Sequence, residues 1–574
     1  MTLSYTIAID APHTHCYGVT IECSVDAHQV TLRLPTWTPG SYMIREFARH
    51  VQQFVAWCDG EPARWHKVAK DSWSIDVRPG ALLRVQYRVY AFDLTVRTAH
   101  LDDSHGFFNP ACICMALVGH ESATHRLRVE APAGWRVTTG LDAVDGWFSA
   151  SDYDELIDSP FECGTHRLVQ FEVDGRPHEI ALWGTGNEDI DRIVADSRRI
   201  VLAARDMFGG LPYRRYVFIV LLADGLYGGL EHRNSVVNLY DRWGFQPERR
   251  YERFLGLTSH EFFHVWNVKR IRPRPLGPFD YRGENYTRQL WVMEGITSYY
   301  DNLLLVRAGL ITPARYLELL AEDIVKHEAL PGKDLQSLTE SSFDAWIKYY
   351  RPDEHSGNSS VSYYLKGSLA ALLLDLLIRH RTAGRRSLDD VMRLLFERYP
   401  VTGPGFDDAL GIRPEVEQVL AAGGAADCDV GAFFSDVIAG CAPLNYGAAF
   451  ASVGLWLEWS QAGHAWHGMT LKTQHGRLVV QSVRSDAPAA LAGIYAGDEL
   501  IALDDVRIDD ERLRARLGER RAGQRVTFSL FRRDTLLHRV VELGAAPAER
   551  LRLAPVVGAI ADDADRAAWL GLTD

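Results

Sequence analysis

The feature that most constrains the fold is a change of hydrophobic pattern along the chain. Up to about residue 180, short runs rich in Val, Ile, Thr and aromatic residues alternate with turn residues, as in GVTIECSV and RVQYRVYAFDLTV. Such runs at short intervals are typical of strands in an all-β sandwich. From Asp189 onward, long segments such as IDRIVADSRRIVLAARDMF and SVSYYLKGSLAALLLDLLIRHR show helical periodicity instead. The pattern therefore predicts a β-rich region followed by a mainly helical one with a small sheet.

A third block begins near Leu455, where short strand-like runs return with one helical segment among them. At roughly 100 to 200 residues per domain, a chain of 574 residues is expected to contain several domains. We expect a multidomain α+β protein with four parts: a sandwich-like all-β domain at 1–180, a mainly helical domain at 181–440, a compact β module at 455–545 and a C-terminal tail at 546–574.

Composition narrows the classes of function. The net charge of −13 has the wrong sign for a surface that collects phosphates, so we expect no nucleic-acid partner. The most apolar stretch, residues 368–378, is short and interrupted by Asp375, so we expect no membrane partner. The eight cysteines include no CxxC pair, and the first residues lack the features of a signal peptide. These observations favour a cytoplasmic protein.

The string HEFFH, residues 260–264, is the strongest chemical signal in the sequence. Residues four apart share a helical face, so the imidazoles of His260 and His264 can reach one metal ion. Glu261 between them is placed to handle a water molecule on that metal. Two histidines satisfied within a helix, beside a surface glutamate, are the alternative interpretation of the string.

A catalytic zinc ion needs a third protein ligand and keeps one position for water. Glu294 lies thirty residues after His264, in the next predicted helix, and apolar side chains precede it in the string WVMEG. A carboxylate buried there without a partner would be costly, and a metal would remove that cost. Asp301 follows two helical turns later, where its carboxylate can orient a ligating histidine, although a solvated position is an equal alternative.

Longer strings resemble a known family. HEFFHVWN followed by WVMEGITSYYDN resembles the gluzincin metallopeptidases, specifically the glycyl aminopeptidase family. That family joins a β-rich N-terminal domain, a thermolysin-like catalytic domain and a PDZ domain, and residues 35–47 (PTWTPGSYMIREF) are similar to its N-terminal signature. The resemblance implies one zinc ion per chain on His260, His264 and Glu294, with Glu261 as the general base.

The string GGLEH is similar to the GxMEN strand motif of the broader one-zinc aminopeptidases. The resemblance implies that Glu231 binds the free α-amine of the substrate and that Gly228 and Gly229 belong to the substrate-binding strand. Leu230 and His232 replace the Met and Asn of the motif. A strand-edge glutamate without a ligand is the alternative interpretation of Glu231.

The string YLKG, residues 364–367, resembles the YxKG of the same enzymes. It implies that Tyr364 donates a hydrogen bond to the tetrahedral oxyanion, where the charge develops only in the transition state. Tyr363 is adjacent and lies on a different helical face. The alternative interpretation is that either tyrosine only caps the apolar helix and has no catalytic role.

The C-terminal block resembles a PDZ domain through VRSDAPA at 483–489 and AGDELI at 496–501. PDZ domains take up extended C-terminal peptides by strand addition, which makes such a peptide a possible partner. HGMT, at residues 467–470, occupies the position of the carboxylate-binding loop but departs from its usual sequence. A purely structural domain is therefore an equal alternative.

These observations together favour a zinc aminopeptidase that acts on peptides with a free N-terminus, and the resemblance implies a preference for small N-terminal residues such as Gly or Ala. Three alternatives remain: an endopeptidase with the same zinc site, a PDZ-type peptide-binding adaptor, and a zinc hydrolase of non-peptide esters or epoxides. The intact set of metal-site residues argues against the adaptor. The sequence does not indicate the oligomeric state.

Overall fold

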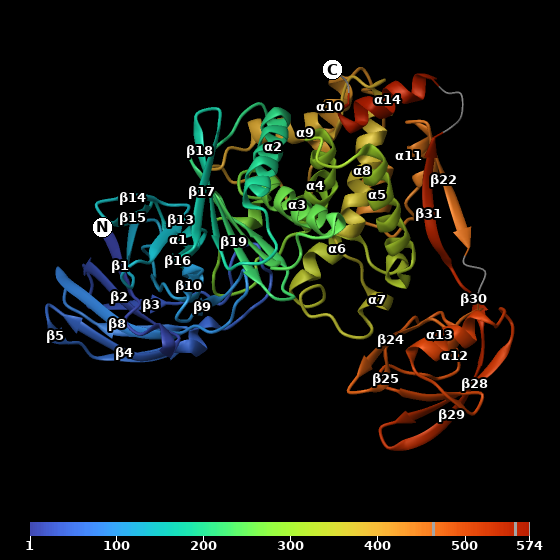
Figure 1. The fold of residues 1–574 in the computed structure, drawn as a ribbon. Coiled ribbons are helices and arrows are strands. Elements are labelled where there is room, and N and C mark those ends of the chain that lie inside the picture. The colour runs from blue at the N-terminus through green and yellow to red at the C-terminus, as the bar shows by residue number, and fades with distance from the viewer. Residues whose placement is uncertain (462–464, 556–559, 573–574) are drawn as a thin grey trace. The chain divides into compact units, whose positions relative to one another are not determined.

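The computed structural model describes residues 1–461, 465–555 and 560–572 (Figure 1). The chain forms two compact units. The first comprises Met1–Thr287, Tyr300–Ile311 and Met392–Gly411, and the second comprises Arg288–Tyr299, Thr312–Val391 and Ile412–Asp574. None of the helices in the described ranges is long and apolar enough to cross a membrane.

The first unit begins with an eight-stranded sheet in the order β14-β15-β12-β1-β2-β8-β4-β5. Tyr17, Val19 and Ile21 alternate with more exposed residues along β2, so one face of the sheet covers the core, as the strand pattern predicts. The strands of the sheet are Thr2–Ala8 (β1), Cys16–Val25 (β2), Val51–Cys58 (β4), Glu61–Pro62 (β5), Ala81–Tyr90 (β8), Thr124–Glu130 (β12), Asp142–Val144 (β14) and Trp147–Ala150 (β15).

Two four-stranded sheets complete this region, in the orders β13-β16-β10-β9 and β11-β3-β7-β6. A short helix, α1 (Tyr153–Ile157), precedes β16. The prediction of an all-β N-terminal domain is therefore confirmed. The strands of the two sheets are Gln29–Arg33 (β3), Trp65–Ala69 (β6), Ser72–Asp76 (β7), Ala99–Leu101 (β9), His105–Phe108 (β10), Ala116–Leu117 (β11), Arg136–Thr139 (β13) and Phe161–Gly164 (β16).

A five-stranded sheet follows, in the order β17-β18-β19-β21-β20. All eight residues of β19 are buried, as its continuous apolar sequence predicts. The edge strand β20 pairs with β21 in antiparallel orientation and packs against α3. These elements are Arg167–Val173 (β17), Arg176–Trp183 (β18), Ile190–Phe208 (α2), Tyr216–Ala223 (β19), Gly228–Glu231 (β20), Ser235–Asp241 (β21) and Glu248–Phe263 (α3).

The second unit is mainly helical up to residue 451. Its longest helix, α8 (Leu365–Arg381), is apolar around most of its circumference and is buried over most of its length. A π-helix at Trp291–Gly295 precedes α4 (Ile296–Arg307), and α4 and α9 (Leu388–Arg398) include residues of both units. The other helices are Pro313–Glu328 (α5), Leu338–Phe343 (α6), Ser356–Ser359 (α7), Arg413–Ala422 (α10) and Tyr446–Ala451 (α11).

The C-terminal β module has its own apolar core and the strand order β24-β25-β26-β28-β29, with β27 paired to β26. This arrangement confirms the predicted PDZ-like β domain. Its elements are Met469–Gln474 (β24), Arg477–Val483 (β25), Pro488–Leu491 (α12), Glu499–Leu503 (β26), Val506–Arg507 (β27), Asp510–Gly518 (α13), Arg525–Arg532 (β28) and Thr535–Glu542 (β29).

Paired strands carry the chain into and out of this module. β22 (Leu455–Gln461) pairs with β31 (Ala548–Pro555), and the short β23 (Ala465–Trp466) pairs with β30 (Gly544–Ala545). Residues 546–574, expected as a tail, thus contain a paired strand, and they also contain helix α14 (Ile560–Leu570).

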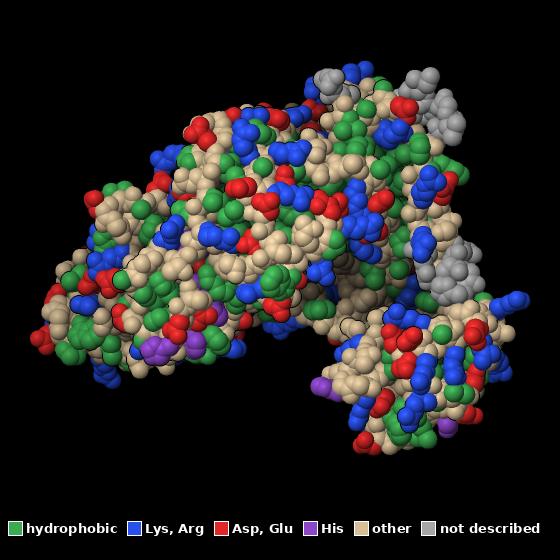
Figure 2. Space-filling model, viewed as in Figure 1, with side chains coloured by type: hydrophobic (Ala, Val, Ile, Leu, Met, Phe, Trp, Pro, Cys, Tyr) green, Lys and Arg blue, Asp and Glu red, His purple; other side chains and the backbone are tan. Residues whose placement is uncertain are grey.

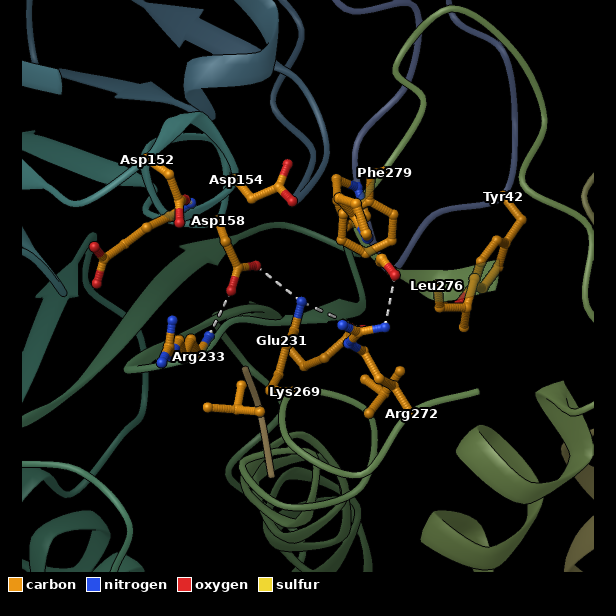
Figure 3. Close-up of a pocket in the computed structure, with 17 residues that line it drawn as sticks. Tyr42, Asp152, Asp154, Asp158, Glu231, Arg233, Lys269, Arg272, Leu276 and Phe279 are labelled. Carbon is orange, nitrogen blue, oxygen red and sulfur yellow. Dashed lines mark hydrogen bonds and ion pairs between the residues drawn. The ribbon is translucent and has the colours of Figure 1, made fainter. Parts of the chain in front are cut away.

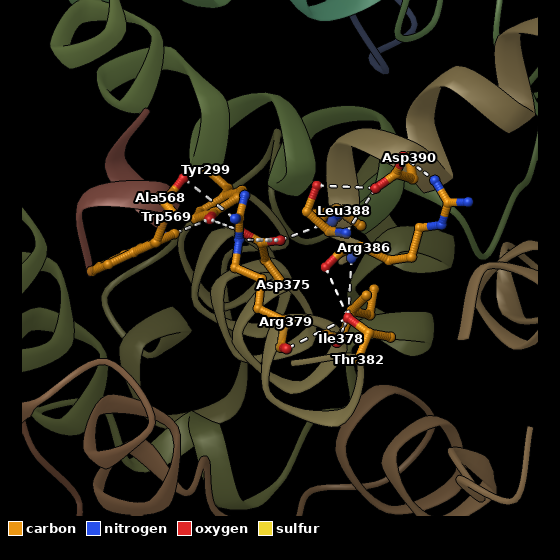
Figure 4. Close-up of polar contacts among 11 residues, drawn as sticks. Tyr299, Asp375, Ile378, Arg379, Thr382, Arg386, Leu388, Asp390, Ala568 and Trp569 are labelled. Carbon is orange, nitrogen blue, oxygen red and sulfur yellow. Dashed lines mark hydrogen bonds and ion pairs between the residues drawn. The ribbon is translucent and has the colours of Figure 1, made fainter. Parts of the chain in front are cut away.

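A buried carboxylate on α8 ties several of these helices together (Figure 4). Asp375, which is 0% exposed, accepts hydrogen bonds from Tyr299 Oη at 2.6 Å, from Arg379 Nε at 3.1 Å and from the backbone N–H of Leu388 at 2.8 Å. Trp569 Nε1 of α14 in turn donates to Tyr299 Oη at 2.9 Å. The C-terminal helix is therefore anchored to the helical core through a shared polar network.

We predict that Asp375→Asn destabilises the protein strongly, because it leaves the largely buried Arg379 guanidinium without its ion pair. Loss of one partner of a buried ion pair typically costs about 3–5 kcal/mol. Urea unfolding of the full chain measures the change. Glu397→Gln, at an exposed carboxylate of α9, is the matched control and is expected to alter the unfolding free energy by less than about 0.5 kcal/mol. Equal stabilities of the two variants would contradict this role for Asp375.

Candidate active site

Helix α3 presents the two histidines of HEFFH at its C-terminal end. The buried Tyr251, Phe254 and Phe262 fix the rotation of the helix against the core. The rings of His260 and His264 consequently lie one above the other on one face, with centroids 4.8 Å apart. Two imidazoles in this arrangement can bind one metal ion.

Each of these rings has an oxygen beside its Nδ1 atom. His264 Nδ1 is 2.7 Å from the backbone oxygen of Asn267, and His260 Nδ1 is 3.5 Å from Asp301 Oδ2. The hydroxyl of Ser259 donates to the backbone oxygen of Asp301 at 2.8 Å, which fixes that part of α4 against α3. An Nδ1–H directed at an oxygen leaves Nε2 with its lone pair, the form that ligates metals.

Two carboxylates lie close to the same ring. One potential ligand atom from each of Glu231, Glu261 and His264 lies within 4.8 Å of the others, and all three residues are buried. Two acids in such proximity, away from water, are costly unless a cation offsets their charge. Imidazole nitrogens and carboxylate oxygens are the donors that zinc accepts in proteins. The two histidines of HEFFH and the acidic groups beside them therefore offer the donor types and the negative charge that fit a zinc ion.

The glycines of β20 differ in what surrounds them. A Cβ atom added at Gly229 would lie 1.9 Å from Oε1 and 2.3 Å from Cδ of Glu261, so the Glu261 side chain occupies the space beside that glycine. A Cβ atom added at Gly228 would meet nothing closer than 3.7 Å, on Val96. Of these two glycines, only Gly229 brings the strand close to Glu261, the HExxH glutamate.

Glu231 follows on the same strand and is 4% exposed. Among the described residues, its Oε1 atom accepts no hydrogen bond, and the nearest cation, Lys269 Nζ, is 3.9 Å away. Both carboxylate oxygens would lie 2.7 Å from a Cβ atom added at Gly40, in the segment 35–47 of the β domain. That segment therefore reaches Glu231.

A cavity of about 210 Å³ opens beside Glu231, and the charged side chains of Glu231 and Lys269 both lie on its wall (Figure 3). Figure 3 shows Lys269 between Glu231 and Asp158, and Lys269 Nζ lies 2.8 Å from Asp158 Oδ1. Burial opposes ionisation of Asp158, but the positive charge of Lys269 and a hydrogen bond from His232 lower its pKa to about 2. Asp158 therefore remains charged at neutral pH and draws the Lys269 ammonium toward itself.

His232, which replaces the Asn of the GxMEN motif, takes part in this network. Its Nδ1 atom lies 3.1 Å from Asp158 Oδ1, and the adjacent backbone N–H of Arg233 donates to Asp158 Oδ2 at 2.8 Å. The side chain of His232 thus holds Asp158 in place.

Glu294 and Tyr364 belong to the second unit, within which they approach each other. Glu294 lies in the π-helix and is 2% exposed, and Tyr364 is the residue before α8. A Cβ atom added at Gly295 would lie 2.6 Å from Cα of Gly367, so the glycines of WVMEG and YLKG bring these two backbones into contact. Burial, and then the negative charge of Glu294, raise the pKa of Tyr364 well above its ordinary value, which keeps the phenol protonated.

Sequence reasoning missed several parts of this site. Nothing marked Asp158 or Lys269, whose partners lie far away in the sequence. Gly40 lies in the 35–47 signature, but that string gave no indication of contact with Glu231. The backbone oxygen of Asn267 cannot be recognised from the type of its side chain. Asn267 follows His264 by three residues, and this spacing favours a turn that returns toward the His264 ring.

Comparison with known proteins identifies the family. The sequence matches the Peptidase M61 N-terminal domain at residues 4–165, the M61 glycyl aminopeptidase at 253–370 and the PDZ domain at 467–543. No curated protein matches the chain.

Two solved structures show different degrees of similarity to this chain. An aminopeptidase N family protein from Idiomarina loihiensis is 32% identical, covers 99% of this chain and 100% of its own, and superposes with a TM-score of 0.93. An M1 zinc metallopeptidase from Deinococcus radiodurans is 14% identical and covers 75% of this chain and 94% of its own, with a TM-score of 0.47. The chain therefore belongs to the M61 glycyl aminopeptidase family of metallopeptidases and is a hydrolase that acts on peptides.

Proposed function

We propose that this metallopeptidase is a zinc-dependent aminopeptidase that removes small residues, Gly or Ala, from the N-termini of peptides. The observation that carries the proposal is the buried carboxylate of Glu231, close to Glu261 and His264, with one oxygen that accepts no hydrogen bond from the described residues. The glycyl aminopeptidase match supports the preference for a small first residue.

His260, His264 and Glu294 would hold one zinc ion per chain. Imidazole and carboxylate are donors that zinc accepts in proteins, and two imidazoles with one carboxylate would leave one tetrahedral position open. Asp301 would orient His260, and the backbone oxygen of Asn267 would orient His264. A zinc ion in such a site supplies Lewis acidity, which polarises the scissile carbonyl and makes water more acidic.

The other groups move protons and stabilise charge. Glu261 would accept the proton of the attacking water and pass it to the leaving amine, and the absence of a side chain at Gly229 gives its carboxylate room. Tyr364 would donate a hydrogen bond from its protonated phenol to the oxyanion that forms at the scissile carbonyl.

Glu231 would determine which end of the peptide is bound. A substrate ammonium near Glu231 would form a charge-assisted hydrogen bond in a site that contains little water. Lys269 is the one competing cation close to Glu231 that the structure records, and its contact with Asp158 at 2.8 Å is shorter than its 3.9 Å approach to Glu231. Asp158 would therefore leave the Glu231 carboxylate available to the substrate.

The match to the PDZ domain raises a second candidate function, which is capture of a peptide by the C-terminal module. In the loop 467–470, the backbone N–H of Met469 donates to Nδ1 of His467 at 2.9 Å. That N–H is therefore already engaged within the loop, which favours a structural role for the module over capture of a peptide carboxylate.

The first prediction separates the aminopeptidase from an endopeptidase. The unaltered enzyme is expected to cleave peptides with a free amine and to refuse their N-acetylated forms. Glu231→Gln is expected to lower kcat/KM for free peptides by about 10- to 150-fold, the equivalent of about 1.5–3 kcal/mol, without loss of zinc. Glu155→Gln, at another carboxylate on the cavity wall, is the control and is expected to retain activity. Equal cleavage of free and acetylated peptides by the unaltered enzyme would assign it to the endopeptidases.

A second prediction concerns the space beside Glu261. Gly229→Ala is expected to displace the Glu261 carboxylate and to lower kcat by about 10²- to 10⁴-fold, the usual contribution of a general base. Gly228→Ala, the same change one residue earlier, is expected to leave kcat within a few-fold of the unaltered enzyme. Circular dichroism and zinc content verify that both variants are folded and loaded. Similar kcat values for the two variants would refute the role of Gly229.

The third prediction distinguishes the two adjacent tyrosines. Tyr364→Phe is expected to lower kcat by about 10²- to 10³-fold with little change in KM, because an oxyanion donor acts mainly in the transition state. Tyr363→Phe is expected to affect stability more than kcat, since Tyr363 is 0% exposed. Steady-state kinetics of a glycyl substrate measure both. A large loss of kcat in Tyr363→Phe alone would reassign the oxyanion donor.

A further inference from the structure

A second cluster of metal-binding residue types lies in the N-terminal β domain, in the hairpin formed by β9 and β10. One potential ligand atom from each of His100, Asp102 and His105 lies within 4.8 Å of the others. His100 and His105 are buried, and Asp102 is partly exposed in the turn between the strands. Figure 2 shows a small group of histidine side chains on the surface of the N-terminal β domain, whereas His100 and His105 lie beneath the surface.

His105 is held in one orientation. Its ring is 0% exposed and stacks on Trp183, with centroids 3.5 Å apart and an interplanar angle of 13°. Its Nδ1 atom lies 3.1 Å from Oε1 of the buried Glu162. Its Nε2 atom is buried and has no hydrogen-bond partner in the described part of the chain. An Nδ1–H that donates to Glu162 leaves a lone pair on Nε2, directed into the protein without a donor.

His100 has the same kind of environment. Its Nε2 atom lies 3.0 Å from Asp102 Oδ2, whereas its buried Nδ1 atom lacks a partner among the residues described. Both imidazoles therefore combine a carboxylate at one nitrogen with a second nitrogen left unsatisfied. The carboxylate of Glu162 beside Nδ1 of His105 is the usual surrounding of a histidine that ligates a metal through its other nitrogen.

Asp102 is fixed by its own turn. Its Oδ1 atom accepts hydrogen bonds from the backbone N–H of Ser104 at 2.7 Å, from the hydroxyl of Ser104 at 2.6 Å and from the backbone N–H of His105 at 3.1 Å. The carboxylate is thus oriented before any ligand arrives, which reduces the entropy lost on binding.

A hairpin stabilised by ordinary hydrogen bonds does not explain these observations. The contact between His100 and Asp102 accounts for one nitrogen of His100 and one oxygen of Asp102. Nδ1 of His100 and Nε2 of His105 remain buried without a hydrogen-bond partner among the described residues. An unsatisfied buried polar group costs about 1–3 kcal/mol. A cation held by Asp102 and by Nε2 of His105 would give that buried lone pair a partner and would also balance the charge of Asp102.

We propose that His100, Asp102 and His105 bind a second zinc-type divalent cation, which stabilises the β9–β10 hairpin. Two imidazoles and a carboxylate suit zinc among the common divalent ions, because imidazole prefers transition metals over magnesium and calcium. The site is separate from the one on α3 and does not depend on the proposed aminopeptidase activity.

The zinc content of the full-length protein, measured by plasma mass spectrometry after zinc loading and gel filtration, tests the proposal. We expect two zinc ions per chain in the unaltered protein and one in Asp102→Asn. Asp103→Asn removes the adjacent exposed carboxylate of the same turn and is expected to retain two. One zinc ion in the unaltered protein, or equal zinc in Asp102→Asn and Asp103→Asn, would overturn the proposal.

A second experiment isolates this site from the active site. The double variant His260→Ala/His264→Ala is expected to retain one zinc ion per chain, and adding His100→Gln should remove it. Zinc is expected to raise the melting temperature of the double variant but not of the triple variant. X-ray absorption at the zinc edge should show two imidazoles in the double variant. A double variant that holds no zinc and melts at the same temperature with and without it would contradict the proposal.

Discussion

The active site depends on one close approach, between the backbone of β20 and the side chain of Glu261 on α3. The absence of a side chain at Gly229 lets the edge strand lie against the HExxH helix, and Glu231 comes two residues later on the same strand. The group proposed to bind the substrate amine and the proposed general base are therefore positioned by the same backbone contact. A larger residue at 229 would separate them, because 1.9 Å leaves no room for a methyl group.

Much of the architecture follows from local pattern, and the structure confirms it. Alternation along β2, the continuous apolar run of β19 and the periodicity of α3 each predict the burial found. Of the candidate site, HEFFH could be predicted because both histidines lie on one helix, where spacing fixes geometry. Gly229 of GGLE and Gly367 of YLKG were recognised by resemblance. The structure supplies the physical reason for each, which is close contact with the Glu261 side chain and with the Gly295 backbone, respectively.

The remainder depends on contacts between distant parts of the sequence. Asp158 lies in the β domain, yet it pairs with Lys269 and His232, and Gly40 reaches Glu231 across nearly two hundred residues. The cluster around His105 likewise draws Glu162 and Trp183 from other strands. No local periodicity encodes such pairings, because each residue alone suits an ordinary loop or strand position. They become visible only when the sheets are assembled.

The pairing of β22 with β31 makes the PDZ-like module an insertion within a longer domain, not an appendage at the end of the chain. After leaving the module, the chain forms α14, whose Trp569 is fully buried and donates to Tyr299. Deleting everything after residue 454 would thus expose the helical core, whereas excising only the segment between the two strands would leave their ladder and the α14 anchor in place. Evolution could exchange or lose the module at these two neighbouring junctions without refolding the peptidase.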